Sequence, residues 1–190
     1  MAAQEPIETT NLDIYGNDAQ PWRRACDAIA AAFGPTTHSD AYTAATLGTV
    51  RPDGRPHAAL VGAIWVDDAL YFVSGPGTRK SRNLASDPRC TVALHAQGMD
   101  VVFEGVAARV TDAGTLAQLA EQYRVNGWPA EVDGAAFTAP YSAPSAGPPP
   151  WYLYRLTIHQ AVGVGGEDGG GATRWKFAAA PTGSAAADRW

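Results

Sequence analysis

The feature that most restricts the fold of this chain is a run of apolar, β-prone segments joined by turns instead of helices. AYTAATLGTV (41–50) and HAALVGAIWV (57–66) flank RPDGRP, in which Pro-Asp-Gly favours a type I turn closed by a glycine. Asp67 and Asp68 then turn the chain into ALYFVS (69–74). Because successive strands form antiparallel hairpins, the sequence predicts a β-barrel with helices outside it.

Further strands and three helices complete the predicted pattern. PWRRACDAIAAAF has apolar residues near helical spacing and is followed by Gly34-Pro35, so it predicts a helix. Thr78 is suited to cap a second helix that ends at Asp87-Pro88, and Thr111 or Asp112 to cap a third. The other predicted strands cover 90–96, 99–110, 151–165 and 172–177.

The length of 190 residues favours one domain. We expect residues 1–20 to be a flexible arm, 21–177 the single domain and 178–190 a flexible tail. Within the domain, the proline-rich segment 128–150 is long for a connection, and part of it, 133–150, is a candidate lid over a pocket.

Composition excludes several classes of protein. The net charge of −5 argues against a nucleic-acid binder, which needs a broad basic face. No apolar run approaches the length of a membrane span, and the polar start has no signal-peptide pattern. Cys26 and Cys90 lack metal or redox spacing, which favours a reduced, cytoplasmic protein.

The densest positive charge of this acidic chain lies in SGPGTRKSRNL (74–84). Arg79 and Lys80 fall in the first turn of the predicted helix, where the helix dipole disfavours cations unless an anion lies between them. This conflict points to a phosphate site, with a solvated charged helix as the alternative.

Other chemical motifs are missing from the sequence. The four histidines have no clustered ligand spacing, so no metal site is predicted. There is no GxSxG motif, neither cysteine lies in a catalytic signature, and the glycines near Arg79 do not have P-loop spacing.

The succession from AYTAATLGTV to CTVAL, with the later DVVFEGVAARVTD and TRWKF, resembles the pyridoxamine 5′-phosphate oxidase-like, flavin-binding split-barrel family over residues 40–177. VRPDGRPH, GTRKSRNLASDP and ATRWKF are similar to actinobacterial members, many of which use the deazaflavin coenzyme F-420 in place of FMN. The resemblance implies a mainly β (α+β) fold, a six-stranded antiparallel split β-barrel with flanking helices, assembled as a homodimer.

The resemblance also implies where a coenzyme binds. The second strand of the family lies along the ring system, and the end of the third strand with the following helix holds the phosphate. Arg174 and Trp175 resemble a motif that approaches the coenzyme from the partner subunit, although core packing is the alternative for Trp175. Carried over by position, the ring-contacting residues are Ala58, Ala59, Leu60, Val61 and Gly62, and the phosphate-binding residues are Ser74, Thr78, Arg79 and Lys80.

Two departures from the family pattern bear on the choice of coenzyme. FMN-using oxidases carry a glutamine at the position of Asp100 and an aromatic residue near 163–166, where this chain has glycines. Arg82 either reaches the acidic tail of a deazaflavin or faces water. Both departures argue against pyridoxamine phosphate oxidase activity itself.

The expected function is a reductase in which reduced coenzyme F-420 passes a hydride to a small unsaturated substrate. Trp65, Tyr141 and Trp151 are candidates for an aromatic substrate wall, with barrel core for Trp65 and dimer contacts for the other two as alternatives. An FMN-binding enzyme on the same barrel, a non-catalytic coenzyme-binding protein and a structural module remain competing interpretations.

Overall fold

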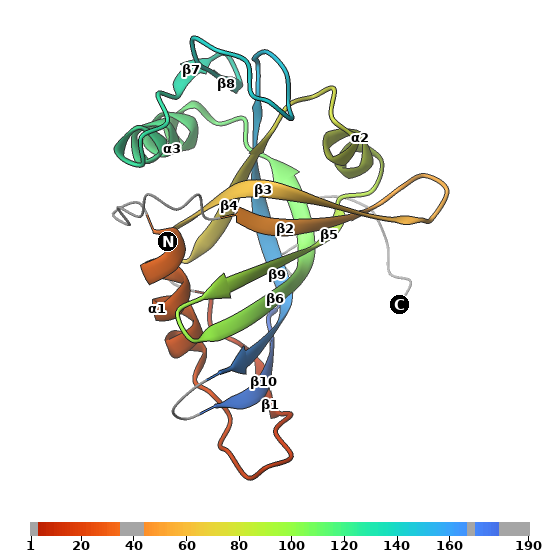
Figure 1. The fold of residues 1–190 in the computed structure, drawn as a ribbon, viewed down its shortest axis with the longest axis vertical. Coiled ribbons are helices and arrows are strands. Elements are labelled where there is room, and N and C mark those ends of the chain that lie inside the picture. The colour runs from red at the N-terminus through yellow and green to blue at the C-terminus, as the bar shows by residue number, and fades with distance from the viewer. Residues whose placement is uncertain (1–3, 35–43, 167–169, 179–190) are drawn as a thin grey trace.

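The computed structural model describes residues 4–34, 44–166 and 170–178, and a closed antiparallel barrel is its centre (Figure 1). The six barrel strands are β2 (Ala44–Val50), β3 (Pro56–Val66), β4 (Ala69–Ser74), β5 (Arg89–Ala96), β6 (Met99–Arg109) and β9 (Tyr152–Gly165). Their order is β9-β4-β3-β2-β5-β6, and β6 pairs again with β9, which closes the ring. The predicted six-stranded split barrel is confirmed.

Strand β9 is long enough to pair with two different strands along one of its edges. Its first residues, Tyr152–Arg155, pair with β4, and from Gln160 onward it pairs with β10 (Gly171–Lys176). A strand β1 (Glu8–Asn11) then pairs with β10 at the edge of the sheet. The expectation of a loose arm over residues 1–20 is therefore wrong for β1, whose polar residues pair through backbone groups that no apolar periodicity reveals.

The predicted helices are present and begin at the expected caps. Thr78 Oγ1 accepts a hydrogen bond from Ser81 N at 3.3 Å, and Asp112 Oδ1 accepts one from Thr115 N at 3.0 Å. The first helix ends at Gly34, as its sequence predicts. The three helices are α1 (Trp22–Phe33), α2 (Arg79–Ser86) and α3 (Ala113–Val125).

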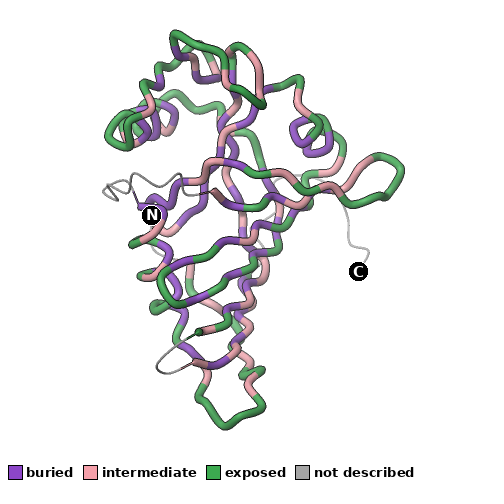
Figure 2. Tube along the Cα trace, in the orientation of Figure 1, coloured by how far each residue is buried: buried purple, intermediate pink, exposed green. Residues whose placement is uncertain are grey.

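Two apolar clusters explain why β3 and β4 are almost continuously apolar (Figure 2). Trp65 and Phe72 face the barrel interior, where α1 also buries its apolar side. Ile64 and Tyr71 face outward into a second cluster beneath α3. A strand covered on both faces has no polar side, which accounts for the unbroken apolar run. Two short strands, β7 (Glu131–Asp133) and β8 (Ala136–Thr138), lie within the segment expected to be a loop.

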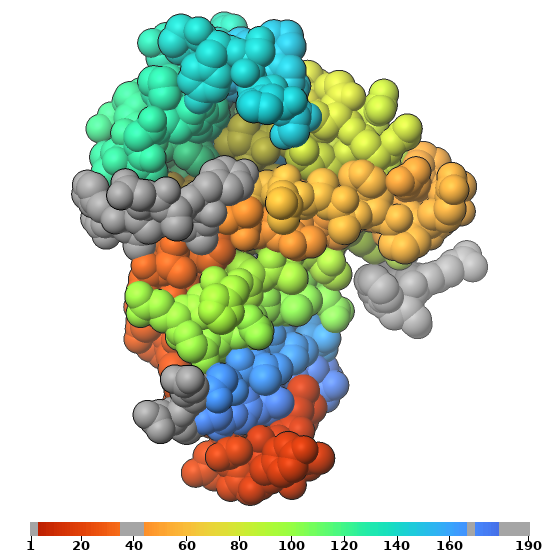
Figure 3. Space-filling view, viewed as in Figure 1, coloured from red at the N-terminus to blue at the C-terminus, as the bar shows by residue number. Residues whose placement is uncertain are grey.

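The hairpin turns follow the predicted chemistry. Asp67 and Asp68 have φ angles of 52° and 55°, as a two-residue hairpin of type I′ requires. In the β2–β3 turn, Gly54 N donates to Arg51 O at 2.8 Å and Gly54 has φ 81°. The resulting β2–β3 hairpin projects from the barrel on the same side as α2 (Figure 1, Figure 3).

Part of the predictions falls outside the described residues. These are most of the tail 178–190 and the first residues, 41–43, of the strand predicted at 41–50. Among the helices of the described chain, none has the length and apolar character to cross a membrane.

Candidate functional site

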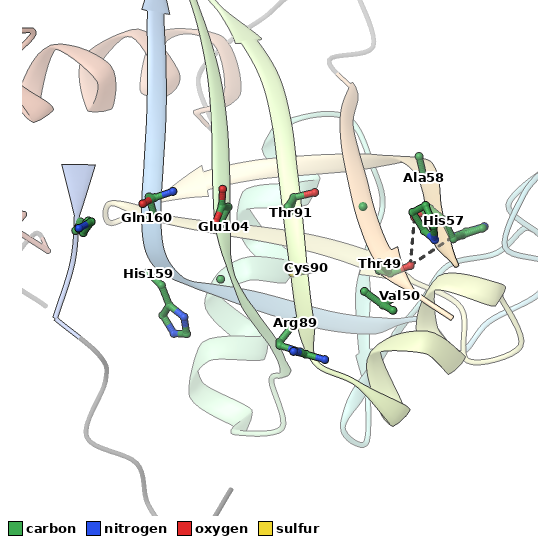
Figure 4. Close-up of a pocket in the computed structure, with 14 residues that line it drawn as sticks. Thr49, Val50, His57, Ala58, Arg89, Cys90, Thr91, Glu104, His159 and Gln160 are labelled. Carbon is green, nitrogen blue, oxygen red and sulfur yellow. Dashed lines mark hydrogen bonds between the residues drawn. The ribbon is translucent and has the colours of Figure 1, made fainter. Parts of the chain in front are cut away.

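A pocket of about 1050 Å³ crosses the outer face of the barrel (Figure 4). Its floor is a row of residues that lie in register on successive strands, from β3 to β10. Thr49 and His57 lie at one side of the pocket, and Glu104 and Gln160 lie at the other (Figure 4). The row consists of Ala58, Gly48, Thr91, Glu104, Gln160 and Lys176.

The floor is flat where β2 and β3 meet. Gly48 has no side chain, and a Cβ built there would lie 2.4 Å from Thr91 Oγ1. Its partner Ala58 is exposed and carries only a methyl group. A planar ring can approach the backbone closely at such a position.

Three cations, Arg51, Arg79 and Lys80, act on the pocket residue His57, although none of the three lines the pocket itself. Burial and the charges of Arg51, Arg79 and Lys80 together lower the pKa of His57. Arg55, in the turn between β2 and β3, forms an ion pair with Asp53 at 2.7 Å. In contrast, the structure gives no acidic partner to Arg51, Arg79 or Lys80 among the residues it describes.

Lys80 is the most unusual member of this cluster. Its residue is only 8% exposed, and within the described chain its ammonium group forms neither an ion pair nor a hydrogen bond. Burial lowers the pKa of Lys80, because the charged form loses hydration. Buried lysines are ordinarily paired, so the arrangement is suited to an anion from outside the chain.

Hydroxyl groups fix the turn that carries this cluster. Ser81 Oγ donates to Ser74 Oγ at 2.8 Å, and Ser74 Oγ lies 2.9 Å from Thr78 Oγ1. Thr78 Oγ1 in turn donates to Gly75 O at 2.9 Å. Tyr154 completes the chain through a hydrogen bond with Ser81, and burial raises the pKa of Tyr154. Ser74 is therefore buried, with its hydroxyl engaged in hydrogen bonds within the turn, and its predicted contact with a phosphate stays a prediction.

A second hydrogen-bonded chain joins α2 to the hairpin. Asn83 Nδ2 donates to Thr49 Oγ1 at 3.0 Å. Thr49 Oγ1 lies 3.4 Å from both His57 Nδ1 and His57 O. The Oδ1 atom of Asn83 is buried and has no hydrogen-bond partner in the described chain.

The candidate phosphate site consists of three cations, the cap of α2 and the histidine on which the cations act. We call these five residues, Arg51, His57, Thr78, Arg79 and Lys80, the cradle.

The structure separates the residues predicted to contact a ring. Ala58 and Leu60 point outward on β3, and Leu60 is 64% exposed. Ala59 is half-buried, Val61 is buried in the core, and Gly62 is half-buried. Strand alternation explains this split, since neighbouring side chains point to opposite faces. The Val61 side chain is therefore part of the barrel interior, and only its backbone lies along the outer face.

The pair Arg174-Trp175 is split in the same way. Trp175 is fully buried, packs against Trp22 with ring centroids 5.4 Å apart, and donates from Nε1 to Gln20 O at 3.0 Å. The prediction that Trp175 approaches a coenzyme is wrong, because its ring fills the core of its own chain. Arg174 is half-buried on the outward face, where its guanidinium contacts Thr10 Oγ1 at 3.4 Å.

The three predicted substrate residues do not form one wall. Trp65 is 3% exposed and stacks on Phe103 inside the barrel, so its assignment to a substrate wall is wrong. Trp151 is 2% exposed and is covered by the segment after β8, with a ring contact to Tyr141 at 6.0 Å. Of the three, only Tyr141 is exposed, and none of them lines the pocket.

Several residues of the site are not evident from sequence reasoning. His57, Thr49 and Gly48 line the pocket, while Arg51 and Asn83 come from the hairpin turn and from the buried side of α2. Their only sequence signal is the alternation along β2 and β3, which places Thr49 opposite His57 once the hairpin register is known.

Comparisons with known proteins agree with this fold. The model of the family described as pyridoxamine 5′-phosphate oxidase matches residues 40–160. A pyridoxine/pyridoxamine 5′-phosphate oxidase from Azorhizobium caulinodans is 30% identical over 132 residues, which cover 60% of this chain and 62% of that protein. The chain thus spans less than two thirds of this relative.

Solved structures with the same fold bind different groups. A heme binding protein from Mycobacterium smegmatis has a TM-score of 0.51 and 21% identity, over 77% of this chain and 55% of that one. A pyridoxamine 5′-phosphate oxidase-related, FMN binding protein from Nostoc punctiforme has a TM-score of 0.51 and 19% identity, over 77% and 84%. These likenesses show the fold, and the match over residues 40–160 shows that the chain belongs to the pyridoxamine 5′-phosphate oxidase family.

Proposed function

We propose that this protein is a reductase that uses reduced coenzyme F-420 to transfer a hydride to a small unsaturated organic substrate. The observation that carries the proposal is Lys80, a buried cation without an anionic partner in the described chain, at the start of α2. A phosphate held there would receive charge-assisted hydrogen bonds from Arg79 and Lys80, which are stronger than neutral ones.

The residues fit a phosphate-bearing tricyclic coenzyme in two respects. The cradle supplies positive charge, and Arg51 Nε is buried without a hydrogen-bond partner among the described residues. The adjacent floor of Gly48 and Ala58 is flat enough for a ring. A bound deazaflavin supplies hydride chemistry, in which an electron-poor double bond takes up a hydride from the coenzyme and a proton from solvent.

The amount of charge favours the deazaflavin over FMN. Arg51, Arg79 and Lys80 act on His57, and Arg82 is exposed two residues beyond Lys80 on α2. None of the four has an acidic partner in the described chain. One phosphate monoester needs fewer cations than this, whereas a phosphodiester followed by an acidic tail can pair with all of them.

We also propose that a second copy of the chain covers the outward face of the barrel. Leu60, Val102 and Val164 are exposed there, at 64%, 41% and 49%. Single exposed apolar residues are ordinary, but three on the face that carries the pocket favour a subunit interface. Light scattering should show a dimer for the native chain and a monomer for Leu60→Glu. The matched control is Val125→Glu on α3, which should remain dimeric; a native monomer would refute the interface.

Turnover tests the catalytic part of the proposal. Reduced F-420 should be oxidised by the purified chain in the presence of some members of a panel of quinones and activated alkenes. Arg79→Ala/Lys80→Ala should abolish this reaction at limiting coenzyme, while Arg23→Ala, which removes one positive charge from α1, should not. Tight binding of F-420 without turnover of any member would instead identify a non-catalytic coenzyme-binding protein.

A further inference from the structure

His57 lines the pocket, and the family resemblance assigns it no role. It lies on β3 next to Ala58 of the floor, is half-buried, and experiences the charges of the three cations of the cradle. The charged groups that act on it from the described chain are Arg51, after β2, and Arg79 and Lys80, on α2. No carboxylate is among them. Within the described chain, the hydrogen-bond partner of the His57 ring is Thr49, through Nδ1, and Nε2 has none.

The other side of the ring is held by Thr49. Because Thr49 Oγ1 accepts a hydrogen bond from Asn83 Nδ2 at 3.0 Å, its own hydrogen is available to His57. That hydrogen can point to His57 Nδ1, at 3.4 Å, which leaves the ring proton on Nε2. The chain Asn83–Thr49–His57 therefore allows the tautomer whose Nε2–H group is available for a ligand.

The same chain also accommodates the protonated ring. If Nδ1 gains a proton it can donate to Thr49 Oγ1, and the threonine hydrogen can turn to His57 O, also at 3.4 Å. Neither protonation state leaves Thr49 without a partner. His57 can thus change its charge without breaking the contact between α2 and the hairpin.

We propose that His57 determines specificity for the phosphate of the coenzyme, by donating a hydrogen bond from Nε2–H to the anion that Arg79 and Lys80 hold. The inference rests on the proposed function, because it takes the ligand to be a phosphate-bearing coenzyme. Burial and three cations disfavour a charged His57 in the chain alone, and an anion in the cradle would offset the effect of the cations. Binding should therefore be accompanied by proton uptake on His57.

Nuclear magnetic resonance of the histidine rings tests this without any catalytic turnover. In the full chain, titration with inorganic phosphate should raise the pKa of His57, and the ring resonances of the exposed His95 should not respond to phosphate. Thr49→Val removes the hydroxyl behind the ring and should change the balance between the two tautomers of His57. An unchanged His57 pKa at saturating phosphate would overturn the inference.

Affinity measurements supply the second arm. His57→Phe should weaken binding of F-420 about tenfold at mildly acidic pH, where the charged ring of the complex adds to the attraction, and by less at alkaline pH. His57→Gln should lose less, because its amide still donates. His95→Phe is the control and should bind normally. A purely structural role would lower affinity equally at both pH values, and that result would also contradict the inference.

The two proposals can fail separately. If the native chain binds neither F-420, FMN nor inorganic phosphate, both the cradle and the role of His57 are wrong. If Arg79→Ala/Lys80→Ala weakens binding while His57→Phe binds as tightly as the native chain at both pH values, only the role of His57 is wrong.

Discussion

Ser81 Oγ donates a hydrogen bond to Ser74 Oγ over 2.8 Å, and this contact fastens the first turn of α2 to the end of β4. Both residues are buried, at 4% and 1% exposure, and Thr78 and Tyr154 extend the same chain of hydroxyls. Two cations of the cradle, Arg79 and Lys80, lie in this turn, directly after Thr78. Its geometry therefore depends on hydroxyl groups that do not themselves face the pocket.

Ser81→Ala should lower the free energy of unfolding by about 1 kcal/mol, because Ser74 and Tyr154 each lose a buried partner. Phosphate affinity should fall as well, since the turn that positions Arg79 is loosened. Urea denaturation and phosphate titration measure the two effects. Ser86→Ala, at the exposed end of α2, is the control and should change neither quantity.

Lys80→Met should stabilise the ligand-free chain by roughly 1 kcal/mol at neutral pH, because it removes a buried charge that has no partner in the described chain. The same change should greatly weaken phosphate binding. Denaturation with and without phosphate checks both effects. A variant that is less stable than the native chain would show that Lys80 already has an anionic partner.

The stability of the native chain should also depend on pH through Lys80. Burial places its folded pKa below the usual 10.5, so the unfolded chain binds more protons in the interval between the two values. The penalty from this group is complete below the folded pKa and disappears as the pH rises toward the unfolded pKa. The difference in unfolding free energy between Lys80→Met and the native chain should accordingly shrink at alkaline pH.

Gly48→Val tests whether the flat floor holds a ring. The new side chain would meet the flexible Thr91 hydroxyl and would project into the pocket. Affinity for F-420 should fall at least about tenfold, while affinity for inorganic phosphate should be unchanged, because phosphate needs only the cradle. Equal loss of both ligands would indicate a distorted hairpin instead of a blocked floor.

Gly163→Ala should destabilise the chain by about 1–3 kcal/mol, because its Cβ would lie 2.7 Å from Trp175 Cη2. Trp175→Phe in the same chain should recover part of this loss, which a double-mutant cycle measures by denaturation. Gly166→Ala is the matched control, since its nearest atom would be 3.8 Å away. Additive losses at Gly163 and Trp175 would mean that the two do not compete for space.

Much of the fold can be predicted from the sequence because most turns and helix caps are determined by residues close together in the chain. The turn at Asp67-Asp68 and the caps at Thr78 and Asp112 are encoded within a few residues, and the structure has each of them where the sequence predicts it. The strand β1 escapes prediction because its pairing with β10 depends on backbone groups that are distant in the chain.

The candidate site is less predictable because it depends on which face a side chain takes. The cations at Arg79 and Lys80 are visible in the sequence as a charge cluster. The burial of Lys80, and the lack of an acidic partner for either residue in the described chain, become evident only in the fold. Trp65 and Trp175 are residues of a type that often lines ligand pockets, but both point into the core. Aromatic residues are common in pockets and in cores, so the sequence alone does not distinguish the two. His57 acquires its significance only when Thr49 and Asn83 are placed behind it.

The most direct test of the account is the dissociation constant for F-420 and for FMN, measured on one preparation of the native chain and of Arg79→Ala/Lys80→Ala. The account predicts tighter binding of F-420 than of FMN by the native chain. It also predicts a loss of about a hundredfold or more for both ligands in the double variant, and a normal affinity in Arg23→Ala. Equal affinity of the double variant and the native chain for F-420 would contradict the cradle, and tighter binding of FMN would contradict the choice of coenzyme.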